Sequence, residues 1–212
     1  MPVVKPGKER GRLIFAMDAT ASRGPTWNQA RQIQGEMFQV TQSLGGLDIQ
    51  LCYYRGFNEF SATPWLADAN TLMQRMGGVS CLGGHTQIEK VLNHAVAERK
   101  NGRINAVIFI GDCFEENPDR VCQVAGSLGL LGVPVFLFHE GRDATAENVF
   151  RQIAHLTKGA YSRFDEGSAE QLRELLHAVA IFAAGGHKAL IDFSNCSGGT
   201  IVKQLVHQLE KG

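Results

Sequence analysis

The chain has 212 residues, 44% of them hydrophobic, which is enough apolar material for the core of one large domain or two small ones. Its 21 basic and 21 acidic residues balance, and neither sign forms a long run, so the composition gives no support to a nucleic-acid partner or an anionic membrane surface. No stretch reaches the roughly 18 uninterrupted apolar residues of a membrane span, and residues 1–12 lack the apolar centre of a signal peptide. We therefore expect an intracellular, cytoplasmic protein without membrane or nucleic-acid contacts.

The cysteines and histidines form no recognisable zinc or disulfide pattern. The five cysteines, an odd number, include no CxxC pair, and the seven histidines include no HxxxH or HExxH motif. A disulfide framework, a structural zinc site and a zinc-hydrolase site are therefore not indicated. We expect the thiols to be reduced.

Apolar runs that predict strands alternate along the chain with the three-and-four spacing of amphipathic helices. Strands are expected, in chain order, at residues 13–17, 47–54, 59–66, 105–110, 133–138 and 160–163. Helices are expected near residues 25–44, 68–76, 88–100, 117–128, 149–153 and 168–182.

Turn and cap signals define several of these boundaries. A short turn at residues 56–58 predicts a hairpin, whose second strand is an antiparallel edge strand that tolerates Pro64. Asn117 and Pro118 suit the cap and first residue of a helix. Ser168 with Gln171 matches a capping box.

Strict alternation of this kind predicts an α/β fold, in which a doubly wound, mostly parallel six-stranded sheet carries helices on both faces. We expect the strand order 3-2-1-4-5-6. Residues 1–11 are interpreted as an N-terminal tail and residues 12–184 as one domain. Residues 185–212 are interpreted as a C-terminal extension with a short strand-like segment at 189–193 and a helix at 201–209.

Polar side chains follow two strands that this order makes neighbours. In a doubly wound sheet the site lies beyond the carboxyl ends of the strands, where the winding reverses, here between the first and fourth strands. Those strands end at Asp18 and Asp112. Thr20 and Ser22 follow Asp18 at alternate positions, and a glycine-rich loop before the helix at 88 brings Thr86 to the same edge.

These oxygen donors together predict a divalent metal site. Two carboxylates about 4 Å apart repel by roughly 4 kcal/mol at an effective dielectric near 20, so a dry pocket that holds both needs a proton or a cation. An all-oxygen set with few carboxylates suits Mg²⁺ or Mn²⁺ better than Ca²⁺. His85 and Cys113 are expected at the rim of the site or beside its access route.

The same residues resemble the metal-ion-dependent adhesion site (MIDAS) of von Willebrand factor A (VWA) domains. That site combines D-x-S-x-S after the first strand, a threonine in a glycine-rich loop and an aspartate that ends the fourth strand. The corresponding segments are Asp18-Ala19-Thr20-Ala21-Ser22, the threonine of GGHT and the aspartate of IFIGDC, and the resemblance covers about residues 12–184. It implies a complete MIDAS of the intracellular prokaryotic type.

The resemblance implies that Thr20 and Ser22 bind the ion directly, and that Asp18, Thr86 and Asp112 bind it directly or through water. Two positions depart from the pattern. Thr20 stands where serine is usual, which keeps the hydroxyl but narrows its rotamers. Cys113 stands where a small residue commonly follows the aspartate, so access or redox sensitivity could differ.

Each residue also has a purely structural interpretation. Thr86 with Glu89 fits a capping box. Asp18 or Ser22 could satisfy turn amides, and Asp112 could simply end a strand.

The expected function is a non-catalytic, cation-dependent protein-interaction module. With two acidic ligands the ion stays electrophilic, and the Glu or Asp of a partner can complete its coordination. The resemblance further implies an adaptor role in an intracellular assembly, such as one with an AAA+ ATPase. Two alternatives stay open: a scaffold with a vestigial metal site, and a Mg²⁺-dependent phosphoryl-transfer enzyme of the haloacid dehalogenase type. Against the enzyme, Thr20 occupies the place of the second aspartate of D-x-D.

Overall fold

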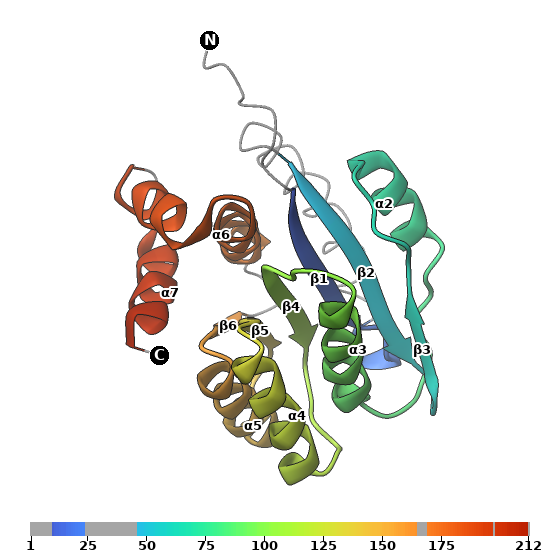
Figure 1. Ribbon diagram of the computed structural model, residues 1–212. Coiled ribbons are helices and arrows are strands. Elements are labelled where there is room, and N and C mark those ends of the chain that lie inside the picture. The colour runs from blue at the N-terminus through green and yellow to red at the C-terminus, as the bar shows by residue number, and fades with distance from the viewer. Residues whose placement is uncertain (1–9, 24–45, 165–168, 197, 212) are drawn as a thin grey trace.

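The computed structural model describes residues 10–23, 46–164, 169–196 and 198–211. The helix expected near residues 25–44 and the Ser168 of the expected capping box lie outside these residues, as does most of the expected N-terminal tail. The described residues form a single sheet with helices on both faces (Figure 1).

The sheet has the predicted strand order. Its strands are β1 (Gly11–Asp18), β2 (Leu47–Arg55), β3 (Glu59–Ala62), β4 (Ala106–Gly111), β5 (Val135–Glu140) and β6 (Ala160–Phe164). They lie in the order β3-β2-β1-β4-β5-β6, and all neighbours are parallel except β2 and β3. The fold class and the antiparallel edge strand are thus confirmed. β3 is shorter than expected, and Leu66 keeps only an isolated bridge to Ile49.

The helices follow the predicted alternation. They are the short 3-10 turn η1 (Ala21–Arg23), α2 (Ala69–Gly77), α3 (Ile88–Lys100), α4 (Pro118–Leu130), α5 (Ala144–Leu156), α6 (Ala169–Cys196) and α7 (Thr200–Lys211). The predicted cap of α4 is confirmed, because the Asn117 side chain accepts hydrogen bonds from the amides of Asp119 and Arg120.

The alternation of side chains along the strands creates two cores, one on each face of the sheet. On β1, Leu13, Phe15 and Met17 face the core that α2, α6 and α7 cover. Ile14 and Ala16 face the core under α3, α4 and α5. All five of these β1 side chains are fully buried, as expected for a central parallel strand.

The C-terminal residues differ from the expectation. Residues 189–193 are helical, not strand-like, and belong to α6, which continues past a non-helical Gly186 with φ 78° and ψ −173°. Leu190 of α6 and Val202 of α7 are buried in the same core as β1. The expected extension therefore packs on the sheet.

α6 is long and apolar enough to cross a membrane by length and composition alone. Its apolar residues, including Leu172, Leu175 and Val179, are instead buried against the sheet, and its backbone is kinked at Gly186. We therefore describe α6 as a core helix.

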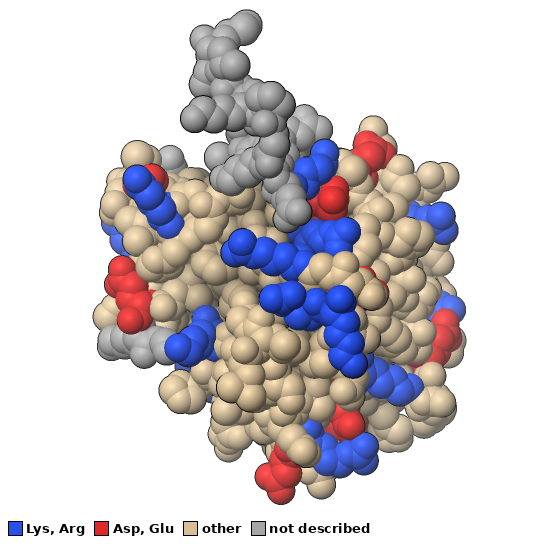
Figure 2. Space-filling model, viewed as in Figure 1, with Lys and Arg blue, Asp and Glu red and all other residues tan. Residues whose placement is uncertain are grey.

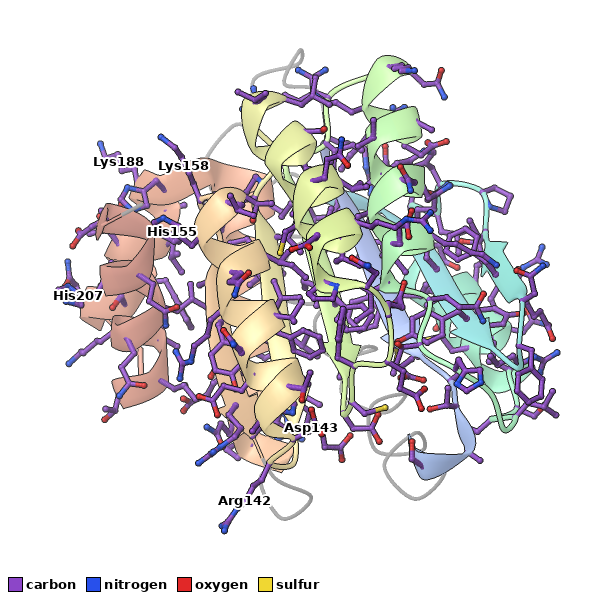
Figure 3. All side chains as sticks on the ribbon, turned by 90° about the horizontal axis from the view of Figure 1, so that it is seen from below. Arg142, Asp143, His155, Lys158, Lys188 and His207 are labelled. Carbon is purple, nitrogen blue, oxygen red and sulfur yellow. The ribbon has the colours of Figure 1, made fainter. Side chains whose placement is uncertain are left out.

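α5 illustrates how the helices are oriented relative to the sheet edges (Figure 3). Asp143 caps its N-terminus by accepting a hydrogen bond from the Ala146 amide, and His155 lies in its last turn. An acidic cap at the N-terminus and a basic residue at the C-terminus complement the helix dipole. Because α5 follows β5, its N-terminus lies at the carboxyl edge of the sheet, the same edge as the candidate site.

Candidate metal site

Asp18 lies at the carboxyl end of β1 and is fully buried. Its Oδ1 accepts a hydrogen bond of 2.7 Å from the Thr20 amide, and its Oδ2 accepts one of 3.0 Å from the Tyr54 hydroxyl. Asp18 therefore satisfies a turn amide, as the structural interpretation predicts. Each carboxylate oxygen has two lone pairs, so a carboxylate that accepts hydrogen bonds can also bind a cation.

Asp112 follows β4 and faces Asp18 across the switch point of the sheet. Ligand atoms of Asp18, Asp112 and Cys113 all lie within 4.8 Å of one another. The Oδ1 atom of Asp112 is buried and accepts no hydrogen bond from the part of the chain that the structure describes. A buried carboxylate oxygen without a partner is costly, and a second carboxylate nearby adds repulsion.

The two hydroxyls of the D-x-T-x-S run lie side by side. The distance between Thr20 Oγ1 and Ser22 Oγ is 3.1 Å, with Thr20 buried and Ser22 exposed in η1. This turn is held in place on both sides: the Ala19 amide donates to the Tyr54 carbonyl, and the Leu82 amide donates to the Ala19 carbonyl. The run is thereby attached to β2 and to the glycine-rich loop.

Thr86 is buried in the loop before α3 and is linked to the loop after β4. Its hydroxyl accepts a hydrogen bond of 3.0 Å from the Glu115 amide, and its own amide donates to Glu115 Oε2 at 3.3 Å. The predicted Thr86–Glu89 capping box does not form. The N-cap of α3 is Gln87, without a side-chain cap, and the Glu116 carboxylate accepts from the amides of Ile88 and Glu89 instead.

The two residues expected at the rim occupy different places. His85 is exposed, lies 3.3 Å from Glu115 Oε2 through Nδ1, and meets the Phe57 ring edge-on at 5.2 Å between centroids. Cys113 is half-buried and close to both carboxylates. Burial raises the pKa of the Cys113 thiol, and the charges of Asp112 and Asp18 raise it further.

Three residues that support the site are not among the sequence-predicted set. Burial raises the pKa of Tyr54 well above its usual range, and the adjacent Asp18 carboxylate adds to the effect, so the phenol stays protonated and donates to Asp18. Glu115 joins the loop after β4 to the loop that carries Thr86, and Glu116 joins it to the first turn of α3. The predicted strand order already makes the strands of Asp18 and Tyr54 neighbours. Since Tyr54 ends its expected strand as Asp18 follows the first, the sequence could have indicated that the two residues pair, as they do in the structure.

The arrangement fits a divalent cation. Two carboxylates have ligand atoms in one small group and supply negative charge, and within the described residues the buried Oδ1 of Asp112 accepts no hydrogen bond. Neutral hydroxyls on two adjoining loops supply further oxygen donors. Oxygen donors of this kind are the usual ligands of Mg²⁺ and Mn²⁺.

The opposite edge of the sheet, at the amino ends of the strands, carries basic side chains. A cavity of about 730 Å³ lies at the amino ends of β1 and β4, and its lining includes Arg10, Arg12 and Arg103. Figure 2 shows Lys and Arg side chains gathered near the centre of the face that it displays. A cavity rich in guanidinium groups does not attract a cation, so the acidic edge is the candidate metal site.

Neither a protein-family model nor a curated protein sequence matches the chain. Solved structures do match. A von Willebrand factor type A protein from Catenulispora acidiphila superposes with a TM-score of 0.65 at 17% identity, over 81% of this chain and 43% of the other. The vWF domain of Mfa5, a type V pili tip protein from Porphyromonas gingivalis, superposes with a TM-score of 0.66 at 10% identity, over 81% of this chain and 94% of the other.

A third similar structure is proximal thread matrix protein 1 from the mussel byssus, described with a zinc-occupied MIDAS motif. Its TM-score is 0.62 at 14% identity, over 82% of this chain and 46% of the other. The chain spans less than half the length of the first structures it matches. With the six-stranded sheet described above, these likenesses establish that the chain has a VWA fold.

Proposed function

We propose that this chain is a protein-interaction module that binds an acidic side chain of its partner through a divalent cation. The ion would be held by Asp18, Thr20, Ser22, Thr86 and Asp112, as the resemblance to the MIDAS implies. The proposal is carried by the buried Oδ1 of Asp112, which accepts no hydrogen bond from any residue that the structure describes and lies beside the buried carboxylate of Asp18. Mg²⁺ or Mn²⁺ is the proposed ion because the proposed ligands are oxygens.

The chemistry of the site supports binding of an acidic partner group. Two carboxylates supply two negative charges, which equal the charge of a divalent ion, and the hydroxyl ligands are neutral. The ion therefore carries no excess negative charge from its ligands and can bind one more anionic oxygen. A Glu or Asp of the partner would supply it at the centre of a desolvated interface, where such a contact contributes strongly to affinity. The zinc-occupied MIDAS of proximal thread matrix protein 1 supports a metal at this place in the fold.

The proposed function is non-catalytic. Phosphoryl transfer on a doubly wound sheet of the haloacid dehalogenase type requires a second aspartate two residues after the first, and Thr20 stands there. An adaptor role in an intracellular assembly, including one with an AAA+ ATPase, remains part of the proposal and rests on the resemblance.

Thermal unfolding of the metal-free chain, with and without Mg²⁺ or Mn²⁺, tests the metal. An ion at about one hundred times its dissociation constant adds roughly 2.7 kcal/mol to the free energy of unfolding, so the melting temperature should rise. Asp18→Ala and Asp112→Ala should abolish the rise. Asp192→Ala, which removes an exposed carboxylate of α6, should retain it. An equal response in the Asp18 variant would refute the ligand assignment, and no response in the parent would favour the vestigial-site alternative.

The interaction itself is tested by affinity capture with the full chain in Mg²⁺ and in EDTA, followed by mass spectrometry. A partner retained in Mg²⁺ and lost in EDTA, and lost again with Asp112→Ala, supports the proposal. Capture that is undiminished in EDTA would place the binding surface elsewhere on the molecule.

A further inference from the structure

A sulfur atom lies among the oxygen donors of the candidate site. Cys113 directly follows Asp112, and its Sγ belongs to the group of ligand atoms of Asp18 and Asp112 that lie within 4.8 Å of one another. The thiol is half-buried at the carboxyl edge of the sheet. The other described cysteines do not belong to this group.

A thiolate changes which ions such a site prefers. Mg²⁺ is a hard ion that binds oxygen, whereas Zn²⁺ and Co²⁺ also accept sulfur. Zinc sites with three protein ligands keep a fourth position for water or an outside group. Two carboxylates and one thiolate are a ligand set of that size.

We propose that Cys113 gives the site a second binding mode, in which Zn²⁺ or Co²⁺ is bound by Asp18, Asp112 and Cys113 and the fourth position stays open for an acidic partner group. This inference rests on the proposed function, because it concerns the ion that the same interaction site uses. With Mg²⁺ or Mn²⁺ the ligands are oxygens and the sulfur is not needed. Cys113 therefore determines the range of ions that the site accepts.

The distances are compatible with this mode. Ligands bound at about 2.0–2.3 Å in tetrahedral geometry lie roughly 3.5 Å apart, and the three donors lie within 4.8 Å of one another, so each pair needs to approach by no more than about 1.3 Å around the ion. Asp112 and Cys113 follow the end of β4 at Gly111, outside the hydrogen-bonded ladder of the sheet.

Formation of the metal–sulfur bond displaces the thiol proton to solvent. Without an ion, a thiol that is half-buried beside two carboxylates is expected to keep its proton. A divalent cation between the carboxylates reverses the sign of the local charge and favours the thiolate. No oxidant or reductant is involved.

Co²⁺ is the probe that reports sulfur directly, because a thiolate ligand gives an intense near-ultraviolet charge-transfer band that oxygen ligands do not give. The experiment uses the reduced, metal-free full chain in a Cys122→Ser/Cys196→Ser background, which removes a half-buried and an exposed thiol from helices α4 and α6. Co²⁺ should produce the band at one equivalent. Cys113→Ser should lose the band and weaken Zn²⁺ and Co²⁺ binding at least about tenfold. Loss of a residue that only hydrogen-bonds to a metal ligand already costs about that much affinity, so loss of a ligand should cost no less.

Mn²⁺ binding, followed by its electron paramagnetic resonance signal, separates this inference from the proposed function. Cys113→Ser should change Mn²⁺ affinity by less than about threefold, because oxygen ligands hold that ion. A parent chain that binds Mn²⁺ but gives no band with Co²⁺ overturns the inference and leaves the proposed function standing. A parent that binds neither ion overturns both.

A band that persists in Cys113→Ser also overturns the inference, since the sulfur would come from another cysteine. Cys113→Ala, checked by circular dichroism, serves where the serine variant does not fold. It should behave as the serine variant does toward Co²⁺, and an undiminished band in either variant contradicts the assignment.

Discussion

Asp18 owes its position to its partner in the neighbouring strand. It pairs in parallel register with Tyr54 of β2, and the tyrosine hydroxyl donates to its Oδ2. The ring of Tyr54 also stacks on Phe109 of β4, and this packing holds the tyrosine hydroxyl next to Asp18. A neutral donor thus satisfies one oxygen of a fully buried carboxyl group.

Tyr54→Phe keeps the ring and removes only this hydroxyl. A hydrogen bond to a charged group contributes about 1.5–3 kcal/mol, so the free energy of unfolding of the metal-free chain should fall by that amount. Urea denaturation measures the change. Tyr53→Phe is the matched control, because the hydroxyl of Tyr53 makes no hydrogen bond within the described residues, and it should stay within about 0.5 kcal/mol of the parent. Equal stability of the two variants would show that the Tyr54–Asp18 contact contributes nothing.

At the scale of elements, the glycine-rich loop is positioned by a close approach of two backbones. A Cβ atom on Gly84 would lie 1.9 Å from the carbonyl oxygen of Gly56, whereas a Cβ on Gly83 would meet no atom within 4 Å. The His85 amide also donates to the Gly56 carbonyl. The hairpin between β2 and β3 therefore sets the path of the loop that carries Thr86.

Gly84→Ala should move this loop, because a backbone carbonyl cannot rotate away as a side chain can. We expect a loss of about 1–3 kcal/mol in stability, typical of overpacking, together with weaker Mn²⁺ binding as Thr86 is displaced. Gly83→Ala should leave both properties close to those of the parent. Calorimetric titration with Mn²⁺ measures the affinity, and identical affinities for the two variants would remove the loop from the site.

The free edge of the sheet at β6 is covered by a side chain of α7. Gln208 Oε1 accepts from the Tyr161 amide at 2.9 Å, and Gln208 Nε2 donates to the Tyr161 carbonyl at 3.0 Å, as a neighbouring strand would. Edge strands with unpaired backbone groups invite association with other chains. α7 therefore protects this edge as well as covering one core.

Gln208→Ala should leave both backbone groups of Tyr161 without these partners and reduce stability by roughly 1–3 kcal/mol. Gln204→Ala, on the exposed side of the same helix, should stay within about 0.5 kcal/mol of the parent. Urea denaturation compares them. Two equally stable variants would contradict the role given to Gln208.

At the scale of the whole molecule, the sequence pattern predicted the sheet because strand and helix alternate strictly. Parallel strands end at one edge, so the order 3-2-1-4-5-6 was sufficient to bring Asp18 and Asp112 together. The prediction of a strand-like segment at residues 189–193 was wrong, because an apolar run of that length fits a strand and a helix equally well. Its helical state depends on tertiary packing, in which Leu190 is buried in the core that β1 also faces.

The contacts that hold the ligands in place could not be predicted from the sequence. Glu116 caps α3 from 28 residues away in the chain, and that pairing depends on how two loops run past each other. The direction of the Cys113 side chain depends in the same way on the backbone after β4. Residue type and spacing predicted the candidate ligands, whereas register and loop path determine what holds them.

In the proposed site, oxygen atoms from three loops share one divalent cation. Anomalous diffraction from crystals of the chain grown in Mn²⁺ tests it most directly. We predict one strong anomalous peak between the carboxylates of Asp18 and Asp112, within bonding distance of hydroxyls from the turn after β1. A peak elsewhere, or none at saturating Mn²⁺, would show that these residues do not bind the ion.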